Sequence, residues 1–386
     1  YYAVRDSGGA LFALTIGVDR ATGMPTNCVV TGQTALAGCG DLECVAWDAA
    51  RRWVWVGDED DGSIRAFDPA TGAERARAAV PAVFDAFRYN RSFEALTLRP
   101  DGLEMWACNE EALCRREAEG RTVKKAAPVR ATTPDVDDGP RATRAHGTRV
   151  RLQRFTRPAP EAAWTAAGQW MYVTDSVGGG DFAGKSRCGV SGLLCLGDGT
   201  LLVLEREMSI KKGKVLPSFR CRIYAIDFNH ADDVADVVAL KETARRPVAK
   251  RRLFGAHTGL AMYEGICLGP ALADGSRSVL LISDGDDGEV PAPPSARGVR
   301  TAVYGRDALR RVRLGTQMLR MRRFGKDRCG YDARNTGLRH NRSLPRCRNL
   351  RGPAWSGGRA PARPDAHQHG PAREVPAPPS ARGAVG

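Results

Sequence analysis

The feature that most constrains the fold is a hairpin unit that recurs along residues 1–288. Short apolar runs alternate there with Gly, Asp and Pro turns, and long stretches of helical periodicity are absent. One turn, DRATG at residues 19–23, returns 49 residues later as DPATG at residues 68–72, each time after an apolar run. A supersecondary unit that repeats at such a period is typical of a propeller blade. We therefore expect an all-β, β-propeller-like domain.

Four stretches share a second pattern, in which an apolar strand, a turn and another apolar strand are followed by acids. They begin at residues 41, 92, 189 and 262, and three of them open with a glutamate: Glu43, Glu94 and Glu264. The start of the first strand and the end of the second lie at the same edge of an antiparallel hairpin. We therefore expect the three glutamates beside the acids that close their hairpins, which are Asp58 and Glu59, Glu110 and Glu111, and Asp284 and Asp286.

A radial arrangement of these hairpins would gather the acids around a central channel as an acidic ring. Neighbouring carboxylates repel one another unless a cation lies between them, and hard oxygen ligands suit Ca²⁺. A bound calcium ion could then hold a phosphate group or polarise a substrate oxygen. The alternative is that the acids are solvated residues at the blade ends, where they favour turns and solubility.

One of these acidic strand ends also contains an arginine, Arg206. Glu205, Arg206 and Glu207 follow the apolar run TLLVL, and we expect all three to emerge at the channel edge. A guanidinium group can hold a phosphate group with two parallel hydrogen bonds. Arg206 is therefore a candidate phosphate contact, and an ion pair with a neighbouring glutamate is the alternative.

Four stretches carry a family resemblance: FEALTLRPDG, NEEAL, SGLLCLGDGTLLVLERE and YEGICLGPALADGSRSVLLISDGDD. Together they resemble the phytase-like family, also described as having an esterase-like activity of phytase, over about residues 38–288. The resemblance implies a β-propeller-like fold, acids that carry phosphoester or ester hydrolysis, and an exported bacterial protein, periplasmic or secreted. The acids that match by position are Glu94, Glu110, Glu111, Glu205, Glu264 and Asp284.

These observations favour a metal-assisted hydrolase of phosphoesters. We expect catalytic or substrate-contacting roles for Glu94, Glu110, Glu264, Asp284 and Arg206. We expect Ca²⁺ ligands among Glu43, Asp58, Glu111, Glu205 and Asp286. Two alternatives remain, a non-catalytic propeller that binds a partner or sugar on its acidic face, and a lactone or ester hydrolase with a similar acidic metal site.

Other catalytic patterns find little support in the sequence. Ser191 lies in GVSGL, which lacks the second glycine of a GxSxG nucleophile motif at the required position. No dinucleotide-binding GxGxxG unit is present. The string GGDFAGKS at residues 179–186 fits the letters of GxxxxGK[ST], but the long helical periodicity into which a phosphate-binding loop must lead is absent. We therefore expect neither a serine triad nor nucleotide chemistry.

The last part of the chain differs in composition from the rest. Residues 1–288 hold 37 Lys and Arg against 38 Asp and Glu, whereas residues 289–386 hold 21 against 6. The decamer EVPAPPSARG at residues 289–298 returns unchanged at residues 374–383. We expect residues 289–386 to be a disordered or aberrant, frame-shifted tail, with a linker or partner-binding segment as the alternative.

The extent of the resemblance and the composition of the tail bear on the completeness of the propeller and on its partners. The resemblance stops before the tail and leaves out part of an N-terminal blade, so the propeller is expected to be incomplete. The basic tail lacks interleaved aromatic residues, and no apolar run is long enough to cross a membrane. We therefore expect a small-molecule substrate, no nucleic-acid partner and no transmembrane segment.

Overall fold

The computed structural model confirms the all-β prediction. It describes residues 1–88, 91–115, 133–214, 216–259, 261–284, 300–304 and 312–315, with only the backbone of Asp284 and of the last two ranges. These residues contain 19 β-strands and three short 3-10 helices. None of the helices in the described part of the chain is long and apolar enough to span a membrane.

The strands form five antiparallel sheets, in each of which strands that are consecutive in sequence are neighbours. The N-terminal sheet consists of β1 (Tyr2–Arg5), β2 (Ala10–Val18) and β3 (Pro25–Ala35). Blade I consists of β4 (Leu42–Asp48), β5 (Trp53–Asp58), β6 (Ser63–Phe67) and β7 (Glu74–Arg77). Blade II consists of β8 (Phe93–Leu98), β9 (Glu104–Asn109), β10 (Arg149–Thr156) and β11 (Thr165–Val173).

Two further four-stranded sheets complete the set. Blade III consists of β12 (Arg187–Cys195), β13 (Leu201–Ser209), β14 (Ser218–Asp227) and β15 (Ala249–Gly259). Blade IV consists of β16 (Met262–Ala271), β17 (Arg277–Asp284), β18 (Arg300–Tyr304) and β19 (Val312–Gly315). The last two strands lie within the segment that we expected to be a disordered tail, and the rest of that segment lies outside the described residues.

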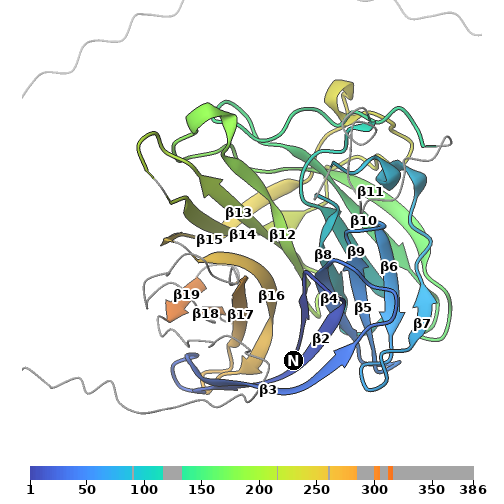
Figure 1. Ribbon diagram of the computed structural model, residues 1–386, viewed down its shortest axis with the longest axis vertical. Coiled ribbons are helices and arrows are strands. Elements are labelled where there is room, and N and C mark those ends of the chain that lie inside the picture. Colours follow the sequence, from blue (N-terminus) through green and yellow to red (C-terminus); the bar gives the residue numbers. More distant parts are fainter. Residues whose placement is uncertain are drawn as a thin grey trace, which may run out of the picture. The chain divides into compact units, whose positions relative to one another are not determined.

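The sheets are arranged around a common centre, as Figure 1 shows. The first strands of successive sheets contact one another: β1 with β4, β4 with β8, β8 with β12, and β12 with β16. Four meandering four-stranded sheets in this radial order are a β-propeller arrangement. The first strand of each blade therefore lines the centre, which is where the acidic ring was predicted.

The two similar turns have the same structure. In the turn between β2 and β3, Asp19 Oδ1 accepts hydrogen bonds from two backbone N–H groups, and Asp68 Oδ1 does the same in the turn between β6 and β7. Each turn ends in a glycine with positive φ, Gly23 in the first and Gly72 in the second. The N-terminal sheet thus matches the last three strands of a blade. Within the described residues it has no counterpart of β4.

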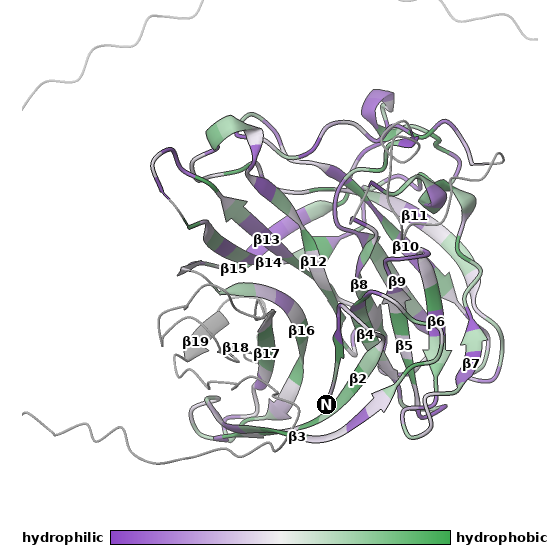
Figure 2. Ribbon diagram, viewed as in Figure 1, coloured by the Kyte–Doolittle hydropathy of each residue, from purple (hydrophilic) through white to green (hydrophobic). Residues whose placement is uncertain are grey.

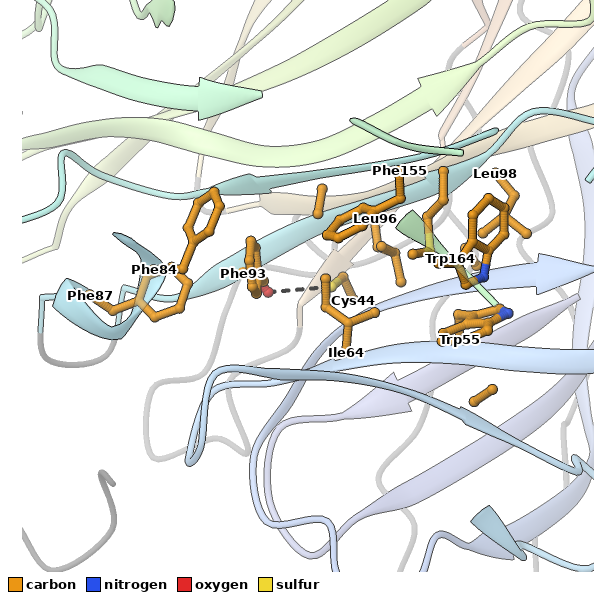
Figure 3. Close-up of a cluster of buried hydrophobic side chains, with 14 of the residues drawn as sticks. Cys44, Trp55, Ile64, Phe84, Phe87, Phe93, Leu96, Leu98, Phe155 and Trp164 are labelled. Carbon is orange, nitrogen blue, oxygen red and sulfur yellow. Dashed lines mark hydrogen bonds between the residues drawn. The ribbon is translucent and has the colours of Figure 1, made fainter. Parts of the chain in front are cut away.

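Hydrophobic clusters fill the spaces between neighbouring sheets, and Figure 2 shows apolar residues along the strands and hydrophilic ones in most connecting turns. The cluster between blades I and II is drawn in Figure 3. Its indole rings, Trp55 and Trp164, meet edge to face with centroids 6.1 Å apart. Cys44 Sγ donates to Phe93 O over 3.3 Å, which links β4 to β8 beside the channel.

Candidate functional site

Each blade has a β-bulge at the same position of its first strand. The register between the first and second strands breaks there, so that one residue has no partner in the ladder. That residue is Glu43 in blade I, Glu94 in blade II, Ser191 in blade III and Glu264 in blade IV. A bulge changes the direction in which a side chain projects from its strand. Four side chains at equivalent positions are therefore redirected in the four blades.

The second strands supply a further set of equivalent residues. Just before the bulges, the first strands pair with Asp58, Asn109, Glu205 and Ser283. The residues that follow these partners are Glu59, Glu110, Arg206 and Asp284. Blade III, which has serine instead of glutamate at its bulge, is thus the blade with a cation at the position that follows this partner.

A pocket of about 420 Å³ opens at the centre, lined by the first strands of all five sheets. Its charged lining includes Glu43, Arg91, Glu94, Arg206 and Glu264. The structure therefore brings together the three bulge glutamates that were selected from the sequence.

Arg206 joins two blades across this pocket. Its Nη1 donates to Glu264 Oε1 of blade IV, and its Nη2 donates to Glu110 Oε1 of blade II. Arg91 Nη1 lies 3.0 Å from the other oxygen, Glu110 Oε2. Burial opposes ionisation of Glu110, but Arg206 and Arg91 outweigh it and lower the pKa of Glu110. Glu110 is therefore a carboxylate at neutral pH.

Glu94, in contrast to Glu110, is protonated at neutral pH. Burial, and then the charges of Glu110 and Glu43, raise the pKa of Glu94 well above its ordinary value. Glu94 forms a side-chain hydrogen bond with Glu110 that favours the ionised form of Glu110, so Glu94 is the donor. The two residues form a pair of carboxyl groups that share one proton at neutral pH.

A second acidic group lies in blade I. Carboxylate oxygens of Asp41, Glu43 and Glu59 lie within 4.8 Å of one another. Glu59 Oε1 accepts from the Ser92 backbone over 2.9 Å, whereas Glu59 Oε2 is buried and has no hydrogen-bond donor within the described part of the chain. Burial, followed by the charge of Glu59, raises the pKa of Glu43 to about 9, and burial raises the pKa of Glu59 to about 7. Without a cation, this group holds protons at neutral pH.

Asp58 lies beside this group and holds its loop in place. It is buried, Arg65 Nη2 donates to Asp58 Oδ2 over 2.5 Å, and the backbone N–H groups of Gly40 and Asp41 donate to its oxygens. Its carboxylate is therefore engaged in positioning the backbone of Asp41.

Glu111 and Glu205 lie in other surroundings. Glu111 is buried, with Arg141 Nε at 3.1 Å and the guanidinium nitrogens of Arg91 and Arg187 at 3.7 Å. Glu205 accepts from Tyr172 Oη and Lys250 Nζ, away from the pocket lining.

The expectation that three consecutive side chains of β13 reach the channel edge was wrong. Successive residues of a strand point to opposite faces. Arg206 therefore lies with the channel acids, whereas Glu205 and Glu207 face the arginines of β14.

Asp284 ends β17 opposite Met262, and its side chain is not among those described. Asp286 lies outside the described residues.

The comparison with protein families shows to which family this chain belongs. The model of the Phytase-like family, described as "Esterase-like activity of phytase", matches residues 1–287. The chain belongs to the Phytase-like family. The match includes the N-terminal sheet, which the resemblance read from the sequence left out. Membership suggests a hydrolase-type β-propeller.

Solved structures show more distant similarities to this Phytase-like chain. The β-propeller domain of Myceliophteria thermophila Cps50 (Swd1) is 9% identical, with a TM-score of 0.30 over 82% of this chain and 85% of that one. The PQQ-bound aldose sugar dehydrogenase of Streptomyces coelicolor is 14% identical, with a TM-score of 0.24 over 76% and 97%. The tricorn protease is 10% identical, with a TM-score of 0.25 over 81% and 31%. The comparison with curated proteins yields no match.

Sequence reasoning missed two residues of the site in this Phytase-like domain. Asp41 precedes Glu43 by two residues in the string DLE, and this acidic spacing could have indicated Asp41 as a further site residue. Arg91 precedes the SFE motif and contacts Glu110 only because β8 and β9 are neighbours. Its role depends on the folded geometry, which its position in the sequence does not reveal.

Proposed function

We propose that the central pocket is the active site of a metal-assisted hydrolase of phosphoesters. The observation that carries the proposal is the group of Asp41, Glu43 and Glu59, whose oxygens lie within 4.8 Å of one another. The buried, unpaired Glu59 Oε2 adds a ligand atom that lacks a hydrogen-bond donor among the described residues. A divalent cation at this place would relieve both the mutual repulsion and the missing contact.

The donor atoms suit calcium. All three side chains offer carboxylate oxygens, which are the hard ligands that Ca²⁺ prefers, and all three belong to one hairpin: Asp41 precedes β4, Glu43 lies in β4 and Glu59 follows β5. When bound, Ca²⁺ would supply a positive charge that holds a phosphate oxygen and stabilises negative charge developing on it. The residues present therefore fit the ion.

The neighbouring carboxyl pair can move a proton. Glu94 holds a proton at neutral pH because it is buried beside Glu110, and a protonated carboxyl group can donate to a leaving oxygen. Glu110 is kept ionised by Arg206 and Arg91 and can accept the proton back. We assign Glu94 as general acid and Glu110 as the base of the pair.

Arg206 and Glu264 complete the arrangement. Both nitrogens of the Arg206 fork are engaged, one by Glu110 and one by Glu264. Arg206 thereby fixes Glu110 at the end of β9 and ties blade II to blade IV. We assign Arg206 as a positioning residue, and Glu264 as the carboxylate that orients it from the opposite side of the pocket.

Hydrolysis of p-nitrophenyl phosphate tests the proposal, measured with excess calcium and with EDTA. We expect activity only with calcium, and a loss of about 10² or more in kcat for Glu94→Gln. Glu242→Gln is the control, because the Glu242 side chain is 79% exposed and outside the pocket lining. Its activity should equal that of the wild type.

Two results would contradict the assignment. Calcium binding without hydrolysis of any phosphoester or ester would support a non-catalytic scaffold with an acidic binding face. Hydrolysis of p-nitrophenyl acetate or a lactone without hydrolysis of the phosphate would support an ester or lactone hydrolase at the same pocket.

A further inference from the structure

A second cavity, of about 690 Å³, lies in blade III and is lined by cationic side chains. Arg220 and Arg222 come from β14, and Arg252 and His257 come from β15. Asp175, on the loop after β11, is the one acid among the described residues of the lining. The channel acids Glu43, Glu94 and Glu264 are not part of this cavity, which therefore needs its own explanation.

The strand register explains why the cations converge. Arg220 pairs with His257 and Arg222 pairs with Gly255, and directly paired residues project from the same face of a sheet. The register between β14 and β15 shifts at Leu253. A bulge of this kind turns the strand, which allows Arg252 to join the same cavity.

Of the cationic side chains of this cavity, Arg222 is buried and paired, and Arg220 contacts the exposed His257. The Arg222 side chain is 5% exposed, its Nη2 donates to Glu207, and its Nε lies 3.4 Å from Asp175 Oδ2. Arg220 Nη2 lies 2.7 Å from His257 Nε2. Since a guanidinium group only donates, the imidazole nitrogen accepts, and His257 holds the Arg220 fork in place.

The charges around the cavity do not balance. Four cations, Lys250, Arg220, Arg222 and Arg252, face three carboxylates, Asp175, Glu205 and Glu207. Arg252 is exposed, and no carboxylate of the described residues forms an ion pair with it. At least one positive charge is therefore available to an incoming anion.

We propose that this cavity binds a phosphate group, either as inorganic phosphate or as part of a phosphomonoester, through Arg220, Arg222 and Arg252. Guanidinium forks match the oxygens of phosphate with paired, charge-assisted hydrogen bonds. Leu253 and Phe254 line the same cavity and would contact an organic substituent on a phosphomonoester. The site does not depend on hydrolysis in the channel.

Calorimetric titration of the full chain tests the site, with sodium phosphate and with glycerol 2-phosphate as separate ligands. EDTA is present throughout, so that no metal in the channel can hold the ligand. We expect both ligands to bind the wild type, and Arg252→Gln to weaken binding by about tenfold or more, since one charged hydrogen bond is lost. The tighter of the two ligands tells whether the site takes free phosphate or a phosphomonoester.

Arg245→Gln is the matched control, because Arg245 is an exposed arginine between β14 and β15 that pairs with Asp236. It should bind phosphate like the wild type. Both variants change exposed side chains, so an unchanged circular dichroism spectrum is expected. The proposal is overturned if the wild type binds neither ligand, if both variants weaken binding equally, or if malonate displaces phosphate at equal concentration.

Discussion

Glu94 and Glu264 are the bulged residues of the first strands of blades II and IV, and both line the central pocket. The same bulge carries Glu43 in blade I. A repeated backbone irregularity thus directs repeated acids to one place. Because a bulge disrupts ladder pairing, its recurrence at one position indicates that the direction of these side chains is a feature of the site.

The stability of the metal-free protein should fall as the pH rises. Glu43 and Glu59 have an ordinary pKa of 4.5, and the fold raises these values to about 9 and about 7. Between those pH values the folded chain holds protons that the unfolded chain has released. The contribution of these protons to the free energy of unfolding is therefore fully present below about pH 4.5 and lost by about pH 9. Thermal melts in EDTA should show a midpoint that decreases from about pH 5 to pH 9. Glu43→Gln should flatten the decrease above about pH 7, and a midpoint that rises over this range would contradict the assignment.

Calcium binding should release protons. At pH 7 Glu43 is protonated and Glu59 is about half protonated, so occupancy by a cation should release about one and a half protons per ion. The measurement is calorimetric titration at pH 7 in buffers of different ionisation enthalpy, whose slope gives the number of protons. An apparent enthalpy that does not depend on the buffer would mean that calcium binds elsewhere.

Arg206 and Glu264 should be energetically coupled. Arg206→Gln leaves Glu110 and Glu264 without their shared cation, and removing one partner of a buried pair costs about 3–5 kcal/mol. Glu264→Gln in the same chain should restore part of this loss, with a coupling of about 1 kcal/mol. Urea unfolding of the single and double variants measures both quantities.

The control for this cycle is Arg75→Gln, since Arg75 and Asp68 form an exposed pair. Its effect should stay within about 0.5 kcal/mol. Strictly additive losses for Arg206→Gln and Glu264→Gln would show that the bridge contributes nothing to holding the two blades together.

Local patterns in the sequence were sufficient to predict the fold class and part of the site. The hairpins place Glu43 beside Glu59 and Glu94 beside Glu110 because their register depends on short turns. The two similar aspartate turns were also sufficient to indicate a repeated unit.

Contacts between blades could not be predicted in the same way. Arg206 meets Glu110 and Glu264 from blades on either side of its own, and no local pattern in the sequence gives those partners. The segment between β9 and β10 lies within blade II, and its Asp138 pairs with the buried Arg151, a contact that no local pattern predicts. The cationic cavity of blade III depends on cross-strand register, so it too became visible only in the fold.

The most direct test of the calcium site is the thermal melt of the full chain and of Glu59→Gln, each with calcium and with EDTA. A ligand that binds only the folded state stabilises it by about 2.7 kcal/mol at a hundredfold excess over its Kd, which corresponds to about 4–5 °C for a domain of this size. We predict such a rise for the wild type and little or none for Glu59→Gln, which keeps the size of the side chain but loses the charge. No rise for the wild type, or an equal rise for both proteins, would contradict a calcium site at Asp41, Glu43 and Glu59.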